Sequence, residues 1–536
     1  MKLFFTIVLC VISFTRIYSQ PYIEWAARYA GNMFNHYAKD MVLDDEGNVY
    51  VTGTLIIDSV NNDFITLMYD KFGSLAWART YDGPQSGEDE PAAIKVDMSG
   101  NIIVTGTSRD TTGPPTKTFS TTIKYSSLGD TLWVKRYINT DSLNYRVTSL
   151  ETDSSGNIYL FGGASFIGES TNLLTLKYDP DGNLDWFREF GTPTTDLASD
   201  IEMDKNDNVI IMGSTGIGQV IMKYNQLGDS IWSTIIDSVR GIKVLADKQN
   251  NIFNAGEYYY QPQRYNYYTA KYDSNGNTLW VASYNNIYNH NDYMEDAVLD
   301  KENNIIVTGI SAKTGELGWD YLTIKYNSNG DSLWVRRFNP VTISNDEPVS
   351  VVTDKNNNVF VTGKSDRATF WNKISTVVYS PSGEQMFVLL YDTNAPFRSH
   401  EPVKMLCDTS GSIYICGNSQ NANGKWDMVV LKYSPVVSSI QQISNEVPGS
   451  FELFQNYPNP FNSSTTIKYY ILKQGQIKIN VRDVLGREIE TLVNFNHLPG
   501  EYKIMFDAKR YSSGIYFYDL SYNGDIIHRR KLVLVK

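Results

Sequence analysis

Polar and apolar residues alternate in short runs along most of the chain, and one arrangement recurs eight times. Each copy has an aspartate, a polar turn, a short apolar run and a glycine, as in "DKNNNVFVTG" at Asp354. Asp, Asn and Gly favour turns because they tolerate positive φ or hydrogen-bond their own backbone, so each copy predicts two strands joined by a tight turn. The copies begin at Asp44, Asp97, Asp153, Asp204, Asp247, Asp300, Asp354 and Asp408.

A second pattern follows at the same period. It is a strand ending in Tyr, a turn containing Gly, and a strand carrying an aromatic residue. The second repeat therefore reads as four strands, "AAIKVD", "NIIVTG", "TTIKY" and "TLWVKRY". Repeats of this size indicate a propeller or a solenoid, and four antiparallel strands per repeat are typical of propeller blades. The aromatic residues are Trp77, Trp133, Trp186, Trp232, Trp280, Trp334 and Phe387.

The two ends of the repeat region complement each other. The eighth repeat runs to Tyr433 and then lacks the Trp strand, whereas "YIEWAARY", with Trp25, precedes the first repeat. We expect this N-terminal strand to complete the last blade and close the ring. The prediction is an all-β chain with a closed propeller of eight four-stranded blades. Seven blades are the alternative, because only 43 residues separate Asp204 from Asp247.

The "D-x-x-GN-x-Y-x-TG" form of the repeat resembles the bacterial SBBP repeat family, over most of the segment from Pro21 to Tyr433. The resemblance implies a bacterial β-propeller. The family label implies seven blades, whereas the count in this chain is eight.

Residues 1–19 are predicted to be a signal peptide. Lys2 precedes an apolar run from Leu3 to Phe14, and Ile17 and Ser19 occupy the −3 and −1 positions of a cleavage site. The run is too short for an ordinary transmembrane helix, so we expect no transmembrane helix after its removal. The expected domains are then the propeller at 20–433, a linker at 434–450 and a C-terminal domain at 451–536.

The segment from Phe451 onward alternates apolar residues with Gly turns, which predicts a small Ig-like β-sandwich. Its motifs "QNYPNPFN", "DVLGREI" and "SSGIYFY", with a last strand ending in Lys, closely resemble the type A sorting domain of the type IX secretion system. Ser463 and Arg482 depart from residues common in that family. The resemblance implies a Bacteroidetes-type bacterium, the type IX machinery as a partner, removal of the tail, and a location outside the cell or on the outer-membrane surface.

Net charge argues against some classes of partner, and cysteine spacing argues against a disulfide. The chain carries a net charge of −12, which argues against nucleic acid or anionic membranes as partners. Cys10 lies in the signal segment, and a tight hairpin at Asp408 would separate Cys407 from Cys416 by several rungs, so we expect no disulfide. The sequence contains no GxSxG, HExxH or CxxC motif and no glycine-rich phosphate-binding loop, so it suggests no catalytic, cofactor or metal site of these kinds.

One ring of positions could nevertheless form a site. Eight residues before each repeat aspartate stand His36, Asp89, Tyr145, Asp196, Val239, Asp292, Asp346 and His400. If the first strand of each blade lines the channel, Asp346, His400, His36 and Asp89 lie together at one channel mouth. A metal or polar-ligand site is one interpretation, although adjacent blades would hold these groups far apart. The other is that the aspartates tether adjacent blades by accepting backbone amides.

A tyrosine-rich stretch supplies the second candidate site. Two loops are expected on the same face as that mouth. One carries Tyr258, Tyr259, Tyr260, Tyr265, Tyr267 and Tyr268, and the other carries Tyr284, Tyr288, His290 and Tyr293; the residues favoured for binding are Tyr258, Tyr259, Tyr260, Tyr284 and Tyr288. Aromatic rings with amide neighbours can bind sugars or peptides, or they can simply pack between blades.

Three functions remain open on sequence alone. The leading hypothesis is a secreted or surface-anchored module that binds a glycan, a peptide or matrix without turnover. The alternative is a carbohydrate-active hydrolase or lyase using Asp89, Glu90, Asp346 and Glu347 at the channel mouth. The third is a structural component of the surface or of gliding motility. Propellers host both binding and catalysis, so the fold does not decide.

Overall fold

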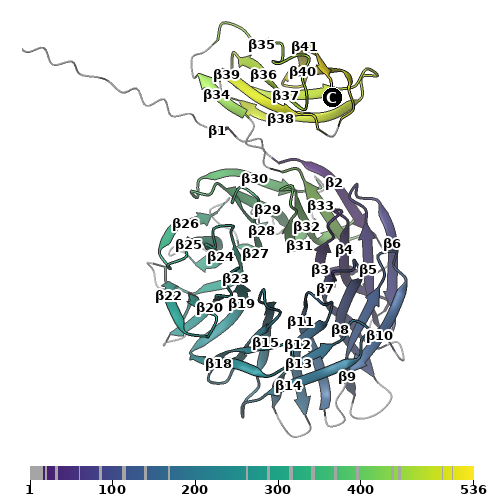
Figure 1. Cartoon of the computed structure of the whole chain (residues 1–536), viewed down its shortest axis with the longest axis vertical. Helices are drawn as coiled ribbons and strands as arrows, with labels where there is room; N and C mark the ends of the chain where they lie inside the picture. The colour runs from purple at the N-terminus through teal and green to yellow at the C-terminus, as the bar shows by residue number, and fades with distance from the viewer. Residues whose placement is uncertain are drawn as a thin grey trace, which may run out of the picture. The chain divides into compact units, whose positions relative to one another are not determined.

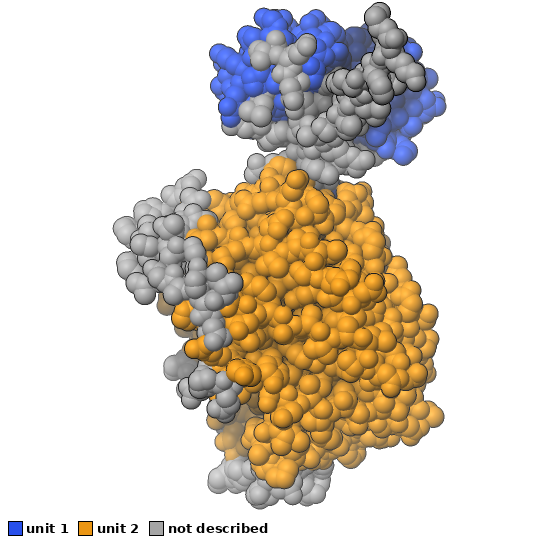
Figure 2. All heavy atoms as spheres, turned by 90° about the vertical axis from the view of Figure 1, so that its left-hand side faces the viewer, with its two compact units in different colours: residues 1–22, 435–536 blue, residues 23–434 orange. Residues whose placement is uncertain are grey.

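The computed structural model divides the chain into two compact units, residues 23–434 and residues 1–22 with 435–536 (Figure 2). It describes residues 16–17, 21–30, 34–58, 61–83, 87–110, 116–137, 142–166, 170–260, 264–286, 290–312, 318–339, 345–366, 371–393, 398–435, 440–444, 448–497, 499–509 and 511–536. All regular elements in these residues are β-strands. Within them, no helix has the length and apolar character needed to cross a membrane. The predicted signal peptide lies outside the described residues except for 16–17.

The larger unit, residues 23–434, contains eight four-stranded blades. Six are separate four-stranded sheets, and blades 2 and 3 share one eight-stranded sheet through a single parallel pair, Asn144 with Thr118. The strands of each blade are lettered a to d in chain order.

Blades 1 to 4 consist of β3 (His36–Leu43), β4 (Val49–Ile56), β5 (Asn62–Tyr69) and β6 (Leu75–Tyr81); β7 (Asp89–Val96), β8 (Ile102–Asp110), β9 (Lys117–Tyr125) and β10 (Thr131–Tyr137); β11 (Ser142–Thr152), β12 (Ile158–Phe166), β13 (Thr171–Tyr178) and β14 (Leu184–Phe190); and β15 (Leu197–Met203), β16 (Val209–Thr215), β17 (Gly218–Tyr224) and β18 (Ser230–Asp237).

Blades 5 to 8 consist of β19 (Val239–Ala246), β20 (Ile252–Tyr260), β21 (Arg264–Tyr272) and β22 (Thr278–Tyr284); β23 (Asp292–Leu299), β24 (Ile305–Ala312), β25 (Trp319–Tyr326) and β26 (Ser332–Phe338); β27 (Asp346–Thr353), β28 (Val359–Asp366), β29 (Asn372–Tyr379) and β30 (Gln385–Tyr391); and β31 (His400–Cys407), β32 (Ile413–Gln420), β33 (Trp426–Tyr433) and β2 (Ile23–Tyr29).

The blades surround a common axis, with strand a of each blade innermost (Figure 1). Each strand a packs against strand a of the next blade, and β3 of blade 1 also packs against β31, β32 and β33 of blade 8. The N-terminal strand β2 pairs antiparallel with β33, with Trp25 opposite Lys432. The pairing expected for the N-terminal strand is therefore present.

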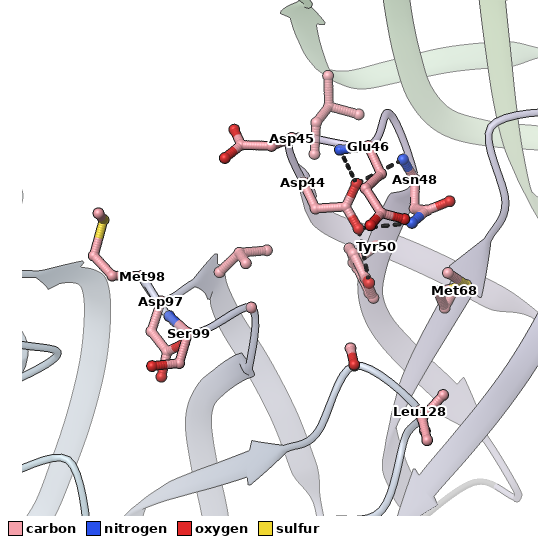
Figure 3. A pocket seen from close by; sticks show the side chains of 14 residues that line it. Asp44, Asp45, Glu46, Asn48, Tyr50, Met68, Asp97, Met98, Ser99 and Leu128 are labelled. Carbon is pink, nitrogen blue, oxygen red and sulfur yellow. Dashed lines mark hydrogen bonds between the residues drawn. The ribbon is translucent and has the colours of Figure 1, made fainter.

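The repeat aspartate holds the turn between strands a and b. Asp44 Oδ1 accepts the amides of Glu46 and Asn48, while Oδ2 accepts the Asn48 side-chain amide and the Tyr50 hydroxyl (Figure 3). The third residue after the aspartate has positive φ in all eight copies, which explains why Gly, Asn or Asp stands there. These residues are Gly47, Gly100, Gly156, Asp207, Asn250, Asn303, Asn357 and Gly411.

A tryptophan joins each of seven blades to the next. Its indole Nε1 donates to a carbonyl in the c–d turn of the following blade at 3.0–3.2 Å, and its ring covers the glycine of that turn. We call this contact the Trp–Gly latch. Its donor and acceptor residues in the described chain are Trp25 and Lys71, Trp77 and Ser127, Trp133 and Pro180, Trp186 and Gln226, Trp232 and Ser274, Trp280 and Ser328, and Trp334 and Pro381.

The hydrophobic core is divided into layers between neighbouring blades. One layer contains Tyr50, Phe64 and Trp77 of blade 1 with Ile102 and Tyr125 of blade 2. Strand b is buried at successive positions, for example from Val49 to Thr54, because a neighbouring blade covers each face of its sheet. Cys407 and Cys416 are free, as predicted, and they pair across the hairpin with Ile413 and Lys404 rather than with each other.

The other unit contains two sheets around one core. The first has the order β1 (Arg16–Ile17), β34 (Ile440–Ser444), β39 (Gly500–Asp507), β36 (Ser464–Ile471) and β35 (Glu452–Leu453); the second has the order β38 (Glu488–His497), β37 (Gly475–Arg482), β40 (Gly514–Tyr522) and β41 (Asp525–Leu534). The core joins Ile467 and Ile504 of the first sheet to Ile479 and Leu520 of the second.

The segment 434–450 differs from the expected linker. Residues 440–444 form β34, which pairs antiparallel with β39, as in Ile440 opposite Ile504. The physical reason is that β39 has a backbone edge not used by β36, and an extended segment satisfies its hydrogen-bonding groups.

The Trp–Gly latch predicts a position-specific cost of an added methyl group. Gly129 and Gly100 both have positive φ, but a Cβ on Gly129 would lie 2.8 Å from the Trp77 ring, whereas nothing lies within 4 Å of one on Gly100. Gly100→Ala should cost only the backbone strain of about 1–2 kcal/mol, and Gly129→Ala should cost about 1–3 kcal/mol more through overpacking. Thermal unfolding of the two variants measures the difference. Equal melting temperatures would contradict the latch.

Candidate functional site

Antiparallel blades place their loops on two faces. The a–b and c–d turns form one face, and the b–c and d–a connections form the other, which we call the loop face. The turn face holds a cavity of about 590 Å³ between blades 1 and 2, lined by Asp44, Tyr50, Met68 and Asp97 among others (Figure 3). Both aspartates there already accept the hydrogen bonds of their own turns.

Four aromatic side chains form a continuous row on the loop face of blades 5 and 6. Tyr259 lies 5.3 Å from Tyr265, Tyr265 lies 5.2 Å from Tyr293, and Tyr293 lies 5.8 Å from Trp319, measured between ring centroids. The row thus crosses from strands b and c of blade 5 to strands a and c of blade 6. All four side chains are partly exposed. We call these residues the aromatic row.

Asn291 fixes the middle of the aromatic row. Its Oδ1 accepts the backbone amide of Tyr265 at 3.1 Å, and its Nδ2 donates to the Tyr293 hydroxyl at 2.9 Å. The Tyr293 phenol is protonated at neutral pH, and burial raises its pKa further, so it can donate to a ligand. Rings held in this way lose little conformational entropy when a ligand binds.

Three tyrosines of the two predicted loops belong to this row, namely Tyr259, Tyr265 and Tyr293. Tyr260 follows Tyr259 in the chain and is 62% exposed. Tyr258 pairs with Val239 and packs on the blade core, and Tyr284 packs against Tyr267. Tyr288 lies outside the described residues. Trp319 was not among the predicted site residues, although it stands seven residues before the tyrosine that ends strand c, the same offset as Tyr265.

The four predicted channel-mouth residues lie where adjacent strands a begin, but they are buried. His36, Asp89, Asp346 and His400 are each no more than 2% exposed. Side chains alternate between the two sides of a strand, and the next position along is less buried in these four blades, where it holds Tyr37, Glu90, Glu347 and Glu401.

The buried ring position anchors the connections between blades. Asp89 accepts the Gly83 amide at 2.5 Å, Asp196 accepts the Thr192 amide, and Asp292 accepts the Asn286 amide. This matches the interpretation in which the aspartates bind backbone amides. Burial lowers the pKa of His400 to about 4, so its imidazole is neutral at pH 7, and its Nδ1 lies 2.7 Å from the Ser419 hydroxyl.

Ionic side chains that sequence analysis did not single out cross the inner strands. Asp200 and Asp296 accept amides of the next blade, from Val244 and Val351. Lys243 Nζ lies 3.1 Å from Asp200, and these charges raise the pKa of Lys243. These contacts extend the blade-to-blade connection into the centre of the ring.

Further charges line the same strands in blades 2 to 4. Lys95 Nζ lies 2.6 Å from Glu151 Oε1. Burial, and then the neighbouring Glu151, raise the pKa of Glu202. Perturbed carboxyls can mark active sites, but ion-pair networks perturb them as well.

One carboxyl on a strand of the aromatic row has a pKa suited to proton transfer. Glu257 is 2% exposed, on the same strand as Tyr259. Burial raises its pKa to about 7, against the weaker attraction of Arg240. Its Oε2 lies 3.6 Å from Arg240 and has no hydrogen-bond partner among the described residues. A carboxyl with a pKa near neutrality can serve as a general acid or base.

Comparison with known proteins identifies one part of the chain. Residues 455–535 match the family described as the secretion system C-terminal sorting domain. The chain therefore carries a type IX sorting tail, and the protein is secreted or held at the cell surface. A search of curated proteins found no match.

The solved structures that resemble this chain are of distant sequence. The Dos1 propeller is 9% identical, with a TM-score of 0.48, over 75% of this chain and 95% of that one. The propeller domain of the trilobed protease from Pyrococcus furiosus is 11% identical, with a TM-score of 0.40, over 68% and 100%. An ulvan lyase is 10% identical, with a TM-score of 0.41, over 75% and 95%. Likeness at this level says nothing about activity.

The raised pKa of Glu257 predicts a pH-dependent stability. Because the folded pKa of about 7 exceeds the model-peptide value of 4.5, the folded state binds more protons between these pH values, and stability falls as pH rises through this window. Glu257→Gln should remove this fall, so its melting temperature relative to the unmodified protein should increase from pH 5 to pH 8. Glu384→Gln, at an exposed turn, is the control. Parallel pH profiles for Glu257→Gln and the unmodified protein would contradict the assignment.

Proposed function

We propose that this protein is a secreted or cell-surface β-propeller that binds a glycan on the aromatic row of blades 5 and 6. The observation that carries the proposal is the continuity of the row: four partly exposed rings, each within 6 Å of the next, span two blades. Aromatic side chains combine an apolar face with a polar tip. Sugar rings, which have apolar C–H faces and hydroxyl edges, complement such a surface.

The binding surface is built on rigid elements. Tyr265, Tyr293 and Trp319 lie at the first or second positions of β21, β23 and β25, where strand pairing fixes the backbone. Asn291 bridges the two blades through Tyr265 and Tyr293. Preorganised aromatic groups with a few polar groups around them are typical of small-ligand sites.

The proposal also covers the type of propeller repeat and the route of export. The propeller is a closed ring of SBBP-type repeats, supported by the β2–β33 pairing and by the latch from Trp25 to Lys71. An N-terminal signal peptide exports it in a Bacteroidetes-type bacterium. The tail is an Ig-like type A sorting domain that the type IX machinery recognises and removes.

Glycan binding is tested by titrating the purified full chain against a panel of bacterial, plant and host polysaccharides. Tyr293→Ala and Trp319→Ala should each weaken the binding found by about ten-fold or more, as expected for a central aromatic contact. Phe72→Ala removes an aromatic residue that is 73% exposed in a c–d turn and should leave affinity unchanged. Full affinity in both row variants would overturn the site, and binding of peptides alone would overturn the ligand class.

A hydrolase or lyase is the second candidate, and Glu257 is the observation that favours it. The acids first considered for catalysis, Asp89, Glu90, Asp346 and Glu347, lie on β7 and β27, whereas Glu257 has a pKa of about 7 and lies on the same strand as Tyr259 of the row. Release of new reducing or unsaturated sugar ends, lost in Glu257→Gln with binding retained, would establish catalysis in place of simple binding.

The sorting tail makes a separate prediction about location. In a host with a type IX system, the full chain should reach the medium or the cell surface. A chain lacking residues 451–536 should accumulate in the periplasm, because the segment that matches the sorting family is gone. Fractionation and immunoblotting measure the distribution. Equal export of both chains would contradict a sorting role.

A further inference from the structure

Three carboxylates converge between blades 1 and 2 on the loop face. Asp63 lies near the start of β5, Asp82 follows β6, and Asp89 begins β7. One oxygen of each lies within 4.8 Å of one oxygen of each of the others. Two oxygens that bind one calcium ion at about 2.3–2.6 Å can be at most about 5 Å apart. The spacing therefore suits a single ion held by all three groups.

Two of these aspartates have a buried oxygen with no hydrogen-bond partner among the described residues. Asp63 is 8% exposed and Asp89 is fully buried, and Oδ1 of each accepts no hydrogen bond from the described residues. Buried carboxylate oxygens are normally paired, because leaving them unpaired costs free energy. Burial, followed by the charges of Asp82 and Asp89, raises the pKa of Asp63 to about 6. Negative charge on this cluster is therefore energetically unfavourable in the absence of a cation.

The repeats of the same chain show how this position is neutralised elsewhere. Asp320 in blade 6 and Asp427 in blade 8 stand at the same place in strand c as Asp63, six residues before its final tyrosine. Each is paired with an arginine of strand d at 2.8 Å, Arg337 and Arg28 respectively. Each arginine also donates to a serine of strand b, Ser311 or Ser419.

Blade 1 lacks both of these partners. Thr80 pairs with Ile65 as Arg337 pairs with Leu322, so the threonine occupies the arginine position. Leu55 pairs with His36 as Ser311 pairs with Asp292, so a leucine occupies the serine position. Asp63 therefore has no arginine opposite it in strand d, and Asp82 and Asp89 add two further carboxylates near it.

The positive charge near Asp89 has a small effect on it. Arg136 of blade 2 lowers the pKa of Asp89, but it acts more weakly than burial, the Ser108 and Gly83 hydrogen bonds and the charge of Asp82. Its side chain is exposed, where solvent screens its charge. Asp82 is exposed as well, which leaves an entry path for an ion.

We propose that Asp63, Asp82 and Asp89 bind one divalent cation, with calcium favoured by the all-oxygen donor set. The ion takes the place of the arginine found in blades 6 and 8. Because Asp63 and Asp82 belong to blade 1 and Asp89 to blade 2, the ion also ties these two blades together. The site lies four blades away around the ring from the aromatic row, so it is independent of glycan binding.

The test is calcium titration of the full chain by calorimetry, with melting temperatures measured in calcium and in chelator. The unmodified protein should bind one ion through this site and melt higher in calcium. Asp63→Asn should raise the dissociation constant by about ten-fold or more, because it removes one of three charged ligands. Asp181→Asn, at an exposed turn acid, should behave like the unmodified protein.

A variant that places an arginine opposite Asp63 makes the test specific. Thr80→Arg restores the arginine of blades 6 and 8, so it should abolish the calcium response and raise the melting temperature in chelator toward that of the calcium-bound protein. Absence of any response of the unmodified protein to calcium, magnesium or manganese would overturn the proposal. So would a calcium response that Asp63→Asn leaves unchanged, because the ion would then bind elsewhere.

Discussion

The contact between a tryptophan ring and a glycine turn connects the blades of this propeller. Each latch joins the outermost strand of one blade to the c–d turn of the next, and the indole hydrogen bond fixes the angle between them. The glycine is required because any Cβ would meet the ring. Phe387 stands at the tryptophan position of blade 7, next to the blade whose own d strand comes from the N-terminus. Tryptophan therefore stands where the next blade has a c–d turn whose carbonyl can accept the indole N–H. Phenylalanine stands where the next blade has no such turn.

This outer set of latches and the inner set of charges act at different radii. Asp200 and Asp296 reach across to the backbone of the next blade near the axis, while the indoles connect the periphery. Contacts at both radii oppose movement between the blades that they join. The central contact of the aromatic row, Tyr265 to Tyr293, joins blades 5 and 6, which the Trp280–Ser328 latch also connects.

Repetition explains why most of the fold could be predicted from the sequence. Eight copies of one turn give the strand order, and the missing last strand with its N-terminal counterpart gives the β2–β33 pairing. The site was less accessible. His36 and Asp89 were placed at the mouth because sequence spacing does not show which side of a strand faces the axis. Trp319, Glu257 and Asp63 are separated in sequence from the groups they meet, and the significance of Thr80 appears only once the strand register aligns it with Arg337.

The origin of blade 8 has a consequence for folding. Every other blade consists of four consecutive strands, so each can form from a local stretch of chain. Blade 8 joins the first strand of the propeller to the last three, and such non-local pairing is slow because the ends of a long chain must meet. Until β2 docks, β33 presents an open edge that can accept any extended strand. The β2 strand of a second copy fits that edge as well as the chain's own, so slow docking at high concentration leads to domain-swapped assemblies rather than to random aggregates.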